Sequence, residues 1–214
     1  MSGKRPSERR NGPAARPQVV IFVKVPRPGR VKTRLARGVG APEAARWFRA
    51  QSRGLIRRLA ADPRWDVRLA VSPEAEGLAT RALPPGPARQ GQGGGDLGAR
   101  MARALFGAPP GPVLVIGADI PGITPAAMAR AFRALAGADA VLGPAEDGGF
   151  WLVGLGPARR APRDLFAGAR WSSPHALADV LANLSDVRVA FADRLADVDT
   201  PDDLRRAARR PARP

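Results

Sequence analysis

Residues 18–35 read QVVIFVKVPRPGRVKTRL, and this stretch decides the fold class. Its first part, Gln18–Lys24, is a continuous apolar run with several β-branched residues. That pattern is typical of a strand buried on both faces of a parallel sheet. The Pro- and Gly-containing segment that follows is expected to form a loop at the carboxyl end of this strand.

Apolar runs and helical patterns alternate along the rest of the chain. Further strands are predicted at residues 66–71, 112–118, 140–143, 150–155 and 187–191. Helices are predicted at residues 41–61, 74–83, 96–106, 124–136, 173–183 and 200–209, and a loop at 84–95. This alternation predicts an α/β fold with a mostly parallel sheet flanked by helices.

The formal charge of +16 is unevenly distributed, because residues 1–17 and 205–214 carry more than half of it. We expect these segments to be mobile basic tails on either side of one folded domain, residues 18–204. A basic chain can bind nucleic acid, but this one has no Tyr to supply stacking surfaces. An Arg-rich nucleic-acid-binding protein is therefore the non-enzyme alternative, and no specific nucleic acid is expected as a partner.

The composition excludes several classes of site. With no Cys and one His, the chain cannot form a disulfide scaffold, a thiol nucleophile, a Cys-ligated metal site or a multi-His metal centre. No apolar run approaches the roughly 20 residues of a membrane span, and residues 1–17 lack the apolar core of a secretory signal. We expect a cytoplasmic protein, in which His175 is structural.

The loop after the first strand is the strongest candidate for a binding site. Lys24 and Lys32 are two of only three lysines in an Arg-dominated chain, and Arg30 and Arg34 lie beside them around Gly29. Ligands bind at the carboxyl ends of strands in open α/β sheets, where backbone N–H groups and cations can hold a di- or triphosphate. The P-loop pattern GxxxxGK[ST] is absent, and a solvated basic loop is the alternative.

A Gly-rich segment, residues 90–101 (QGQGGGDLGARM), is the second candidate. Its glycines would allow the backbone to approach a flat ligand closely, and a Gln side chain could pair with the edge of a base. The residues alone are equally compatible with a flexible loop before a helix, which Asp96 would cap.

Carboxylates follow the strands at two further places. Asp119 directly follows a buried strand, where it could bind a hard cation or cap a turn. Asp202 and Asp203 suit the first turn of the last helix, whereas Asp197 and Asp199 precede that helix and need another role. Carboxylates near a phosphate-binding loop are the usual arrangement for Mg²⁺ bridged to phosphates.

Six segments in this order resemble the radical-SAM/selenodomain-associated transferase family. They are IFVKVPRPGRVKTRLA (21–36), GQGGGDLGARM (91–101), VIGADIPGIT (115–124), VLGPAEDGGFWLVGL (141–155), WSSP (171–174) and DVDTPDDL (197–204). The resemblance covers roughly residues 18–205. It implies a GT-A, or nucleotide-diphospho-sugar transferase, fold, and the start of the chain is also similar to the 2-phospho-lactate guanylyltransferases.

The resemblance implies a role for each matched segment. The residues implied to bind the nucleotide are Lys24, Gly29, Arg30, Lys32, Arg34, Gln92, Gly95 and Asp96. The implied ligands of Mg²⁺ or Mn²⁺ are Asp119 and Asp199, supported by Asp197. The residues implied to face the acceptor or sugar are Asp147, Gly148 and Gly149, and the implied catalytic residues are Lys32, Asp119 and Asp147.

The sequence thus predicts a metal-dependent transferase acting on a nucleotide-activated substrate. The resemblance favours glycosyl transfer from a nucleotide sugar to a small-molecule acceptor. The loop cations favour the alternative, a guanylyltransferase-like nucleotidylyltransferase, because they exceed what a diphosphate with its Mg²⁺ requires and suit a triphosphate that releases pyrophosphate. The acceptor, the base and the oligomeric state stay open.

Overall fold

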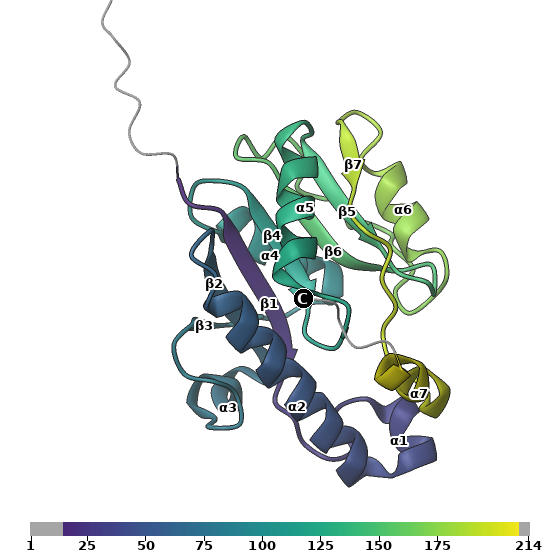
Figure 1. Ribbon diagram of the computed structural model, residues 1–214. Coiled ribbons are helices and arrows are strands. Elements are labelled where there is room, and N and C mark those ends of the chain that lie inside the picture. The colour runs from purple at the N-terminus through teal and green to yellow at the C-terminus, as the bar shows by residue number, and fades with distance from the viewer. Residues whose placement is uncertain (1–14, 210–214) are drawn as a thin grey trace, which may run out of the picture.

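The computed structural model describes residues 15–209, which form a seven-stranded sheet with helices on both faces (Figure 1). The strands are β1 (Gln18–Lys24), β2 (Asp66–Ser72), β3 (Ala88–Gly91), β4 (Val113–Gly117), β5 (Ala140–Pro144), β6 (Phe150–Leu155) and β7 (Val189–Phe191). Their order is β3-β2-β1-β4-β6-β5-β7, and only β6 runs antiparallel to its neighbours. The predicted α/β class with a mostly parallel sheet is confirmed.

Strand β1 lies inside the sheet, paired in parallel with β2 and β4. Val19, Ile21 and Val23 pack on the face covered by α2 (Ala41–Ala60) and α5 (Pro125–Ala136). Val20 packs on the opposite face, with α4 (Leu97–Gly107) and α6 (Ala176–Ala182). Burial on both faces explains why this run is continuously apolar.

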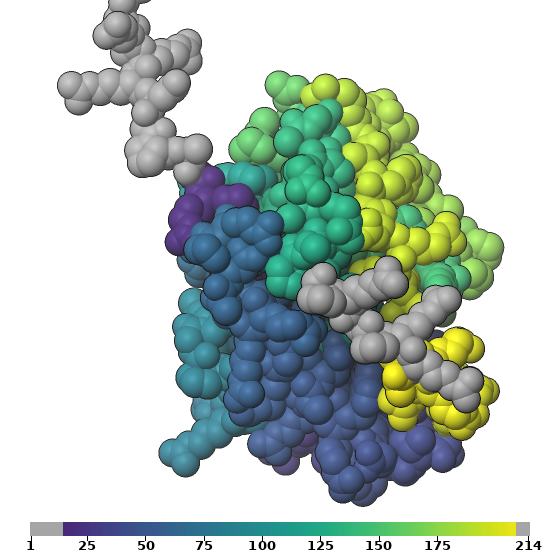
Figure 2. Space-filling model, in the orientation of Figure 1, coloured from purple at the N-terminus to yellow at the C-terminus, as the bar shows by residue number. Residues whose placement is uncertain are grey.

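Two short helices pack together beyond the carboxyl end of β1. These are α1 (Thr33–Val39) and α7 (Pro201–Arg209), and Figure 2 shows α7 (yellow) at the surface beside the violet-blue segment of α1. Leu35 of α1 and Val198, just before α7, are buried in the same small cluster. This packing brings the end of the chain to the loop that follows β1.

Helix α7 extends to Arg209, so regular structure continues beyond the predicted domain boundary at residue 204. The remaining parts of the predicted tails, residues 1–14 and 210–214, lie outside the described residues. Within residues 15–209, no helix is both long and apolar enough to cross a membrane.

Several predicted elements differ from those observed. Helix α1 and strand β3 occupy segments predicted as loops, and α3 (Glu74–Ala79) is shorter than the predicted helix at 74–83. Strand β3 has no β-branched residue and forms through its pairing with β2. Helix α6 begins at Ala176 rather than at the predicted residue 173.

Candidate functional site

Lys32 lies among three carboxylates at the carboxyl edge of the sheet. Its Nζ is 2.8 Å from Asp119 Oδ2, 2.9 Å from Asp199 Oδ1 and 3.8 Å from Asp197 Oδ2. The Lys32 side chain is only 5% exposed, whereas the three carboxylates are each about one-third exposed. We call these four residues the acidic cluster. It joins the loop after β1, the end of β4 and the segment before α7.

The backbone of Lys32 is left-handed, with φ 47° and ψ 50°. This conformation is uncommon for a residue with a side chain, and such residues concentrate at functional sites. Lys32 directly precedes α1, and its carbonyl accepts a hydrogen bond from Ala36 N at 2.9 Å. The start of α1 thus fixes the backbone from which the ammonium enters the acidic cluster.

Asp199 is positioned by the start of α7. The Asp203 carboxylate accepts hydrogen bonds from Asp199 N (3.1 Å) and Thr200 N (2.7 Å), and Thr200 Oγ1 accepts one from Asp203 N (3.2 Å). This reciprocal pattern is a capping box. Asp203 thus lies in the first turn of α7, as predicted, and it also holds the backbone of Asp199. Arg34 Nη1 binds the other oxygen of Asp199 at 3.1 Å.

The acidic cluster carries an excess of negative charge. Burial alone would lower the pKa of Lys32, but the charges and hydrogen bonds of Asp119 and Asp199 outweigh it and raise that pKa. Burial, then the charges of Asp199, Asp119 and Asp147, raise the pKa of Asp197 to about 6, although Lys32 acts in the opposite direction. Even with Arg34 bound to Asp199, two cations do not neutralise three carboxylates, so the cluster favours an added cation.

A cavity of about 320 Å³ adjoins the acidic cluster. Lys32 and Asp119 form one part of its wall, and Gln92 and Arg100 form another. Its remaining lining comes from Lys24 and from the apolar residues Phe22, Val31, Phe48, Leu97 and Ala118. We call it the central cavity. Its apolar and cationic walls suit a nucleotide, which has a flat base and charged phosphates.

The cationic side chains of the loop after β1, which we call the basic loop, divide into those that pair with a carboxylate and those that do not. Lys32 and Arg34 both bind Asp199 of the acidic cluster, and Arg27 pairs with Glu76. Within residues 15–209, Lys24 and Arg30 form no ion pair. Both line a smaller cavity of about 190 Å³. The predicted cationic loop is therefore partly neutralised within the protein.

The Gly-rich segment connects β3 to α4. Asp96 caps α4 as predicted, since its Oδ1 accepts a hydrogen bond from Ala99 N at 2.8 Å. Gly95 has φ +92°, and a Cβ there would lie 2.9 Å from that of Ala99, so glycine is required at this turn. Gln92 points inward and is 7% exposed, with its Nε2 bound to Ala70 O at 2.9 Å. Its amide is thus occupied within the protein.

Asp147 lies in the turn between β5 and β6, where its Oδ1 accepts a hydrogen bond from Gly149 N at 3.0 Å. Gly148 has φ +84°, and a Cβ at this position would lie 2.3 Å from Pro174 O. The turn therefore packs directly against the segment before α6. Asp147 is exposed, and its charge contributes to the raised pKa of Asp197. Asp147, one of the residues implied to face the acceptor, thus lies within electrostatic range of Asp197.

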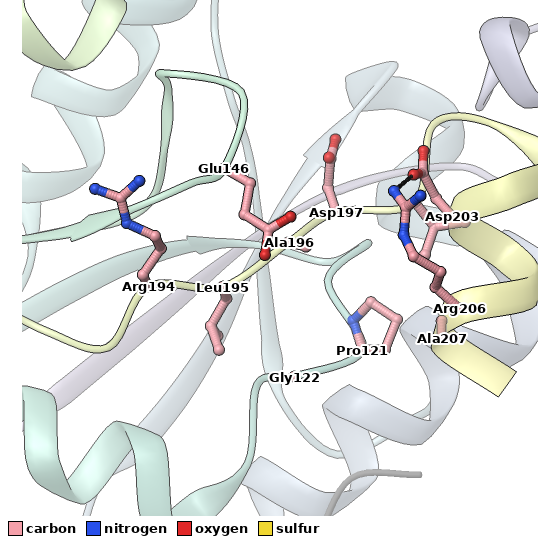
Figure 3. A pocket seen from close by; sticks show the side chains of 11 residues that line it. Pro121, Gly122, Glu146, Arg194, Leu195, Ala196, Asp197, Asp203, Arg206 and Ala207 are labelled. Carbon is pink, nitrogen blue, oxygen red and sulfur yellow. Dashed lines mark hydrogen bonds and ion pairs between the residues drawn. The ribbon is translucent and has the colours of Figure 1, made fainter. Parts of the chain in front are cut away.

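A larger cavity, of about 500 Å³, lies between α7 and the loop after β4 (Figure 3). Asp197 and Glu146 line it together with Pro121, Leu195 and Arg206, and Arg206 pairs with Asp203. Asp197 belongs both to this wall and to the acidic cluster. Neither Glu146 nor Arg206 was singled out from the sequence as a site residue.

The structure thus brings Lys32, Asp119, Asp197 and Asp199 together, although up to 167 positions separate them along the chain. The cations of the loop after β1 do not all face one cavity, because Arg30 lines the smaller cavity and Lys32 the central cavity. Sequence reasoning missed Arg100. The only available signal was its place in the segment GQGGGDLGARM, eight positions after Gln92.

The donor set of the acidic cluster fits a divalent cation, although its present geometry is that of an ion-pair cluster. Carboxylate oxygens are the preferred ligands of Mg²⁺ and suit Mn²⁺. Within residues 15–209, no three His, Cys, Asp or Glu side chains are grouped closely enough to form a metal site as they stand. Here the carboxylates surround the Lys32 ammonium, so a metal could bind only if that ammonium moved aside.

Known proteins share both sequence and fold with this chain. The family described as "Uncharacterized protein conserved in bacteria (DUF2064)" matches residues 55–173. A Desulfovibrio desulfuricans G20 protein, provisionally named a nucleotide-diphospho-sugar transferase, is 30% identical with a TM-score of 0.79. The match covers 88% of this chain and 84% of that one. No functionally curated protein matches the chain in sequence.

More distant structures share only the fold. The 4-diphosphocytidyl-2C-methyl-D-erythritol synthase of Anaerococcus prevotii DSM 20548 is 12% identical with a TM-score of 0.56, over 90% of this chain and 96% of that one. Glucosyl-3-phosphoglycerate synthase of Mycobacterium tuberculosis, in complex with Mn²⁺, UDP and glucosyl-3-phosphoglycerate, is 12% identical with a TM-score of 0.54. That match covers 90% of this chain and 75% of the synthase.

The expected nucleotide-diphospho-sugar transferase fold is confirmed. The association with radical-SAM and selenodomain proteins is not tested by these matches and stays a prediction. The family match covers more than half of the chain, and the Desulfovibrio protein matches most of it. The chain belongs to the DUF2064 family of bacterial proteins.

Proposed function

We propose that this protein is a metal-dependent glycosyltransferase that moves a sugar from a nucleoside diphosphate to a small acceptor. The observation that carries this proposal is the acidic cluster, in which Lys32 lies within 4 Å of three carboxylates at the wall of the central cavity. The cavity supplies space and cations for a nucleotide, and the carboxylates supply ligands for its metal. The name of the 30%-identical Desulfovibrio protein supports the same substrate class.

The distribution of cations favours a diphosphate over a triphosphate. Lys24 lines the central cavity with no internal ion pair in the described part of the chain, and Arg30 lies free in the adjacent small cavity. Lys32 and Arg34, by contrast, are already bound to carboxylates. The surplus of charge that favoured a triphosphate is therefore smaller than the sequence suggests. The two uncommitted cations of this loop, together with a divalent metal, suit a diphosphate leaving group.

Asp119 and Asp199 would hold the metal, with Asp197 beside them. When bound, Mg²⁺ or Mn²⁺ would neutralise the negative charge that develops on the diphosphate as it leaves. Lys32 would turn from the carboxylates toward the phosphates, where its ammonium can donate hydrogen bonds to the same developing charge. Asp199 remains in place during this exchange, because the capping box holds its backbone.

The transfer itself requires one bond to form and one to break. The acceptor oxygen bonds to the anomeric carbon of the sugar, and the bond from that carbon to the β-phosphate oxygen breaks. The electron pair of the broken bond leaves with the nucleoside diphosphate, while the acceptor's proton goes to a carboxylate. Asp147 is our candidate for this base, because it is exposed, lies within electrostatic range of Asp197 and is hydrogen-bonded only through its Oδ1 within the described residues.

Nucleotidyl transfer is the second candidate, favoured by the four cations of the basic loop. If Lys32 and Arg34 both left their carboxylates, the loop would offer Lys24, Arg30, Lys32 and Arg34 to a triphosphate. The fold is compatible with this chemistry, since the Anaerococcus synthase shares it. The two candidates differ in the leaving group, which is a nucleoside diphosphate in one case and pyrophosphate in the other.

A product assay separates the two reactions. The full chain is incubated with Mg²⁺ or Mn²⁺ and either nucleotide sugars or nucleoside triphosphates, together with a panel of small hydroxylated acceptors. Our proposal predicts release of nucleoside diphosphate from a nucleotide sugar, dependent on the metal and abolished by EDTA. Release of pyrophosphate from a triphosphate, with no turnover of any nucleotide sugar, would overturn it.

A further inference from the structure

Gln92 and Arg100 form a hydrogen-bonded pair on one wall of the central cavity. Gln92 donates its Nε2 to Ala70 O at 2.9 Å, and its Oε1 accepts a hydrogen bond from Arg100 Nη1 at 3.2 Å. Both polar atoms of the buried amide are therefore used. These two bonds hold the amide in place, so that Gln92 orients Arg100.

Arg100 is held at a second point as well. Its Nε donates to Asp96 O at 3.1 Å, in the first turn of α4. These two bonds fix the plane of the guanidinium, while Nη2 makes no hydrogen bond within the described residues. No described carboxylate lies within ion-pair distance of Arg100. Arg100 thus offers a rigid, cationic, planar set of donors to the cavity.

The rest of this part of the cavity suits a flat aromatic ligand. Phe22 lies at the end of β1, and Leu97, at the start of α4, leaves 38% of its surface exposed. Both line the same cavity as Arg100. Apolar side chains on one side and a directional donor on another are the usual features of a base-binding pocket.

We propose that Arg100 reads the base of the nucleotide and selects guanine or cytosine over adenine and uracil; this inference rests on the proposed function. A guanidinium only donates, so it requires a base edge with neighbouring acceptors. Guanine offers O6 and N7, which match the guanidinium fork. Cytosine also offers two neighbouring acceptors, O2 and N3. Adenine places an amino donor beside N7, and uracil has an N–H between its two carbonyls, so each of these leaves a donor facing Arg100.

Equilibrium binding of nucleoside diphosphates tests this proposal in the full chain with Mg²⁺ present. We expect GDP and CDP to bind at least about tenfold more tightly than ADP or UDP, within the range of about 5- to 150-fold for one bidentate pair. Inosine diphosphate keeps O6 and N7 and lacks the 2-amino group, so it should bind like GDP. This comparison needs no variant and therefore does not depend on whether a variant folds.

The variant Arg100→Lys keeps the charge and loses the planar fork. We expect it to lose most of the preference for GDP while its affinity for ADP stays within about twofold. Arg163→Lys is the matched control, because Arg163 packs over the ring of Phe106 and lines none of the cavities described. It should keep the wild-type preference.

Other outcomes overturn the proposal in distinguishable ways. If Arg100→Lys weakens all the diphosphates equally, Arg100 binds phosphate rather than a base, and the proposed function survives. If the wild-type protein binds all of them equally well, the base selection is wrong and the proposed function again survives. If none binds with or without Mg²⁺, the proposed function and this inference fail together.

Discussion

Lys32 combines a strained backbone with a buried ammonium that faces three carboxylates. Each feature is destabilising alone, since a left-handed non-glycine residue costs about 1 kcal/mol or more and unpaired buried charges cost more. The ion pairs between the Lys32 ammonium and the three carboxylates offset these costs. In the proposed function, Lys32 stabilises this cluster until a metal and a nucleotide take over its contacts.

Replacement of Lys32 by Met tests this role. The three carboxylates then lack their ammonium, so we expect the free energy of unfolding in EDTA to fall by about 1–3 kcal/mol. Millimolar Mn²⁺ should raise the melting temperature of Lys32→Met more than that of the wild type, because the ion no longer competes with the ammonium.

Lys24→Met is the control for this experiment, since Lys24 has no carboxylate partner in residues 15–209. Its melting temperature in EDTA should match that of the wild type. Equal melting temperatures for Lys32→Met and the wild type in EDTA would contradict the stabilising role.

At the scale of elements, the start of α7 links the stability of the helix to the geometry of the site. Asp203→Ala removes the capping box, which costs about 0.5–2 kcal/mol and releases the backbone of Asp199. We expect this variant to melt at a lower temperature and to bind GDP with Mg²⁺ more weakly. Asp202→Ala is the matched control, because within residues 15–209 the Asp202 carboxylate pairs only with Arg205. Equal effects of the two substitutions on binding would show that the cap does not position Asp199.

The segment before α6 is held to that helix by one ion pair, between Arg170 and Asp179. Asp179 accepts hydrogen bonds from Arg170 Nε at 3.0 Å, Nη2 at 2.8 Å and the Arg170 backbone N at 2.9 Å. These bonds lower the pKa of Asp179 from 3.8 to about 2, and the bonds from the guanidinium have the largest effect. The folded state therefore favours the ionised form of this group.

The sign of this pKa shift predicts how stability depends on pH. The contribution of Asp179 is complete above pH 3.8 and disappears as the pH falls toward 2. We expect Asp179→Asn to melt at a lower temperature than the wild type at pH 7, and the difference to shrink as the pH falls through about 2. A difference that stays constant from pH 7 to pH 2 would contradict this assignment.

Elements with strong local patterns were predicted well, and those formed by pairing or packing were not. Thr124 caps α5 and Asp96 caps α4, as their sequences indicate. Strand β3 forms only beside β2, and α1 follows a left-handed Lys32, so neither has a local signal that a sequence could show. Local propensity governs the first kind of element, and tertiary contacts govern the second.

At the scale of the whole molecule, the topology assembles the site from distant segments. Parallel β1 and β4 place Lys32 and Asp119 at the same edge, which their position after apolar strands already indicated. Asp199 reaches this edge because α7 packs on α1, and no sequence pattern predicted that contact. The inward orientation of the Gln92 side chain could not be predicted from the sequence either, because it depends on a hydrogen bond to Ala70 O.

The central claim is that the acidic cluster binds a divalent metal together with a nucleotide. The most direct measurement is the affinity for GDP by calorimetry, with and without Mn²⁺, in the wild type and in Asp119→Asn. We predict that Mn²⁺ tightens binding at least about tenfold in the wild type, a coupling of about 1.4 kcal/mol, and has little effect in the variant. Equal tightening by Mn²⁺ in both proteins would contradict the claim.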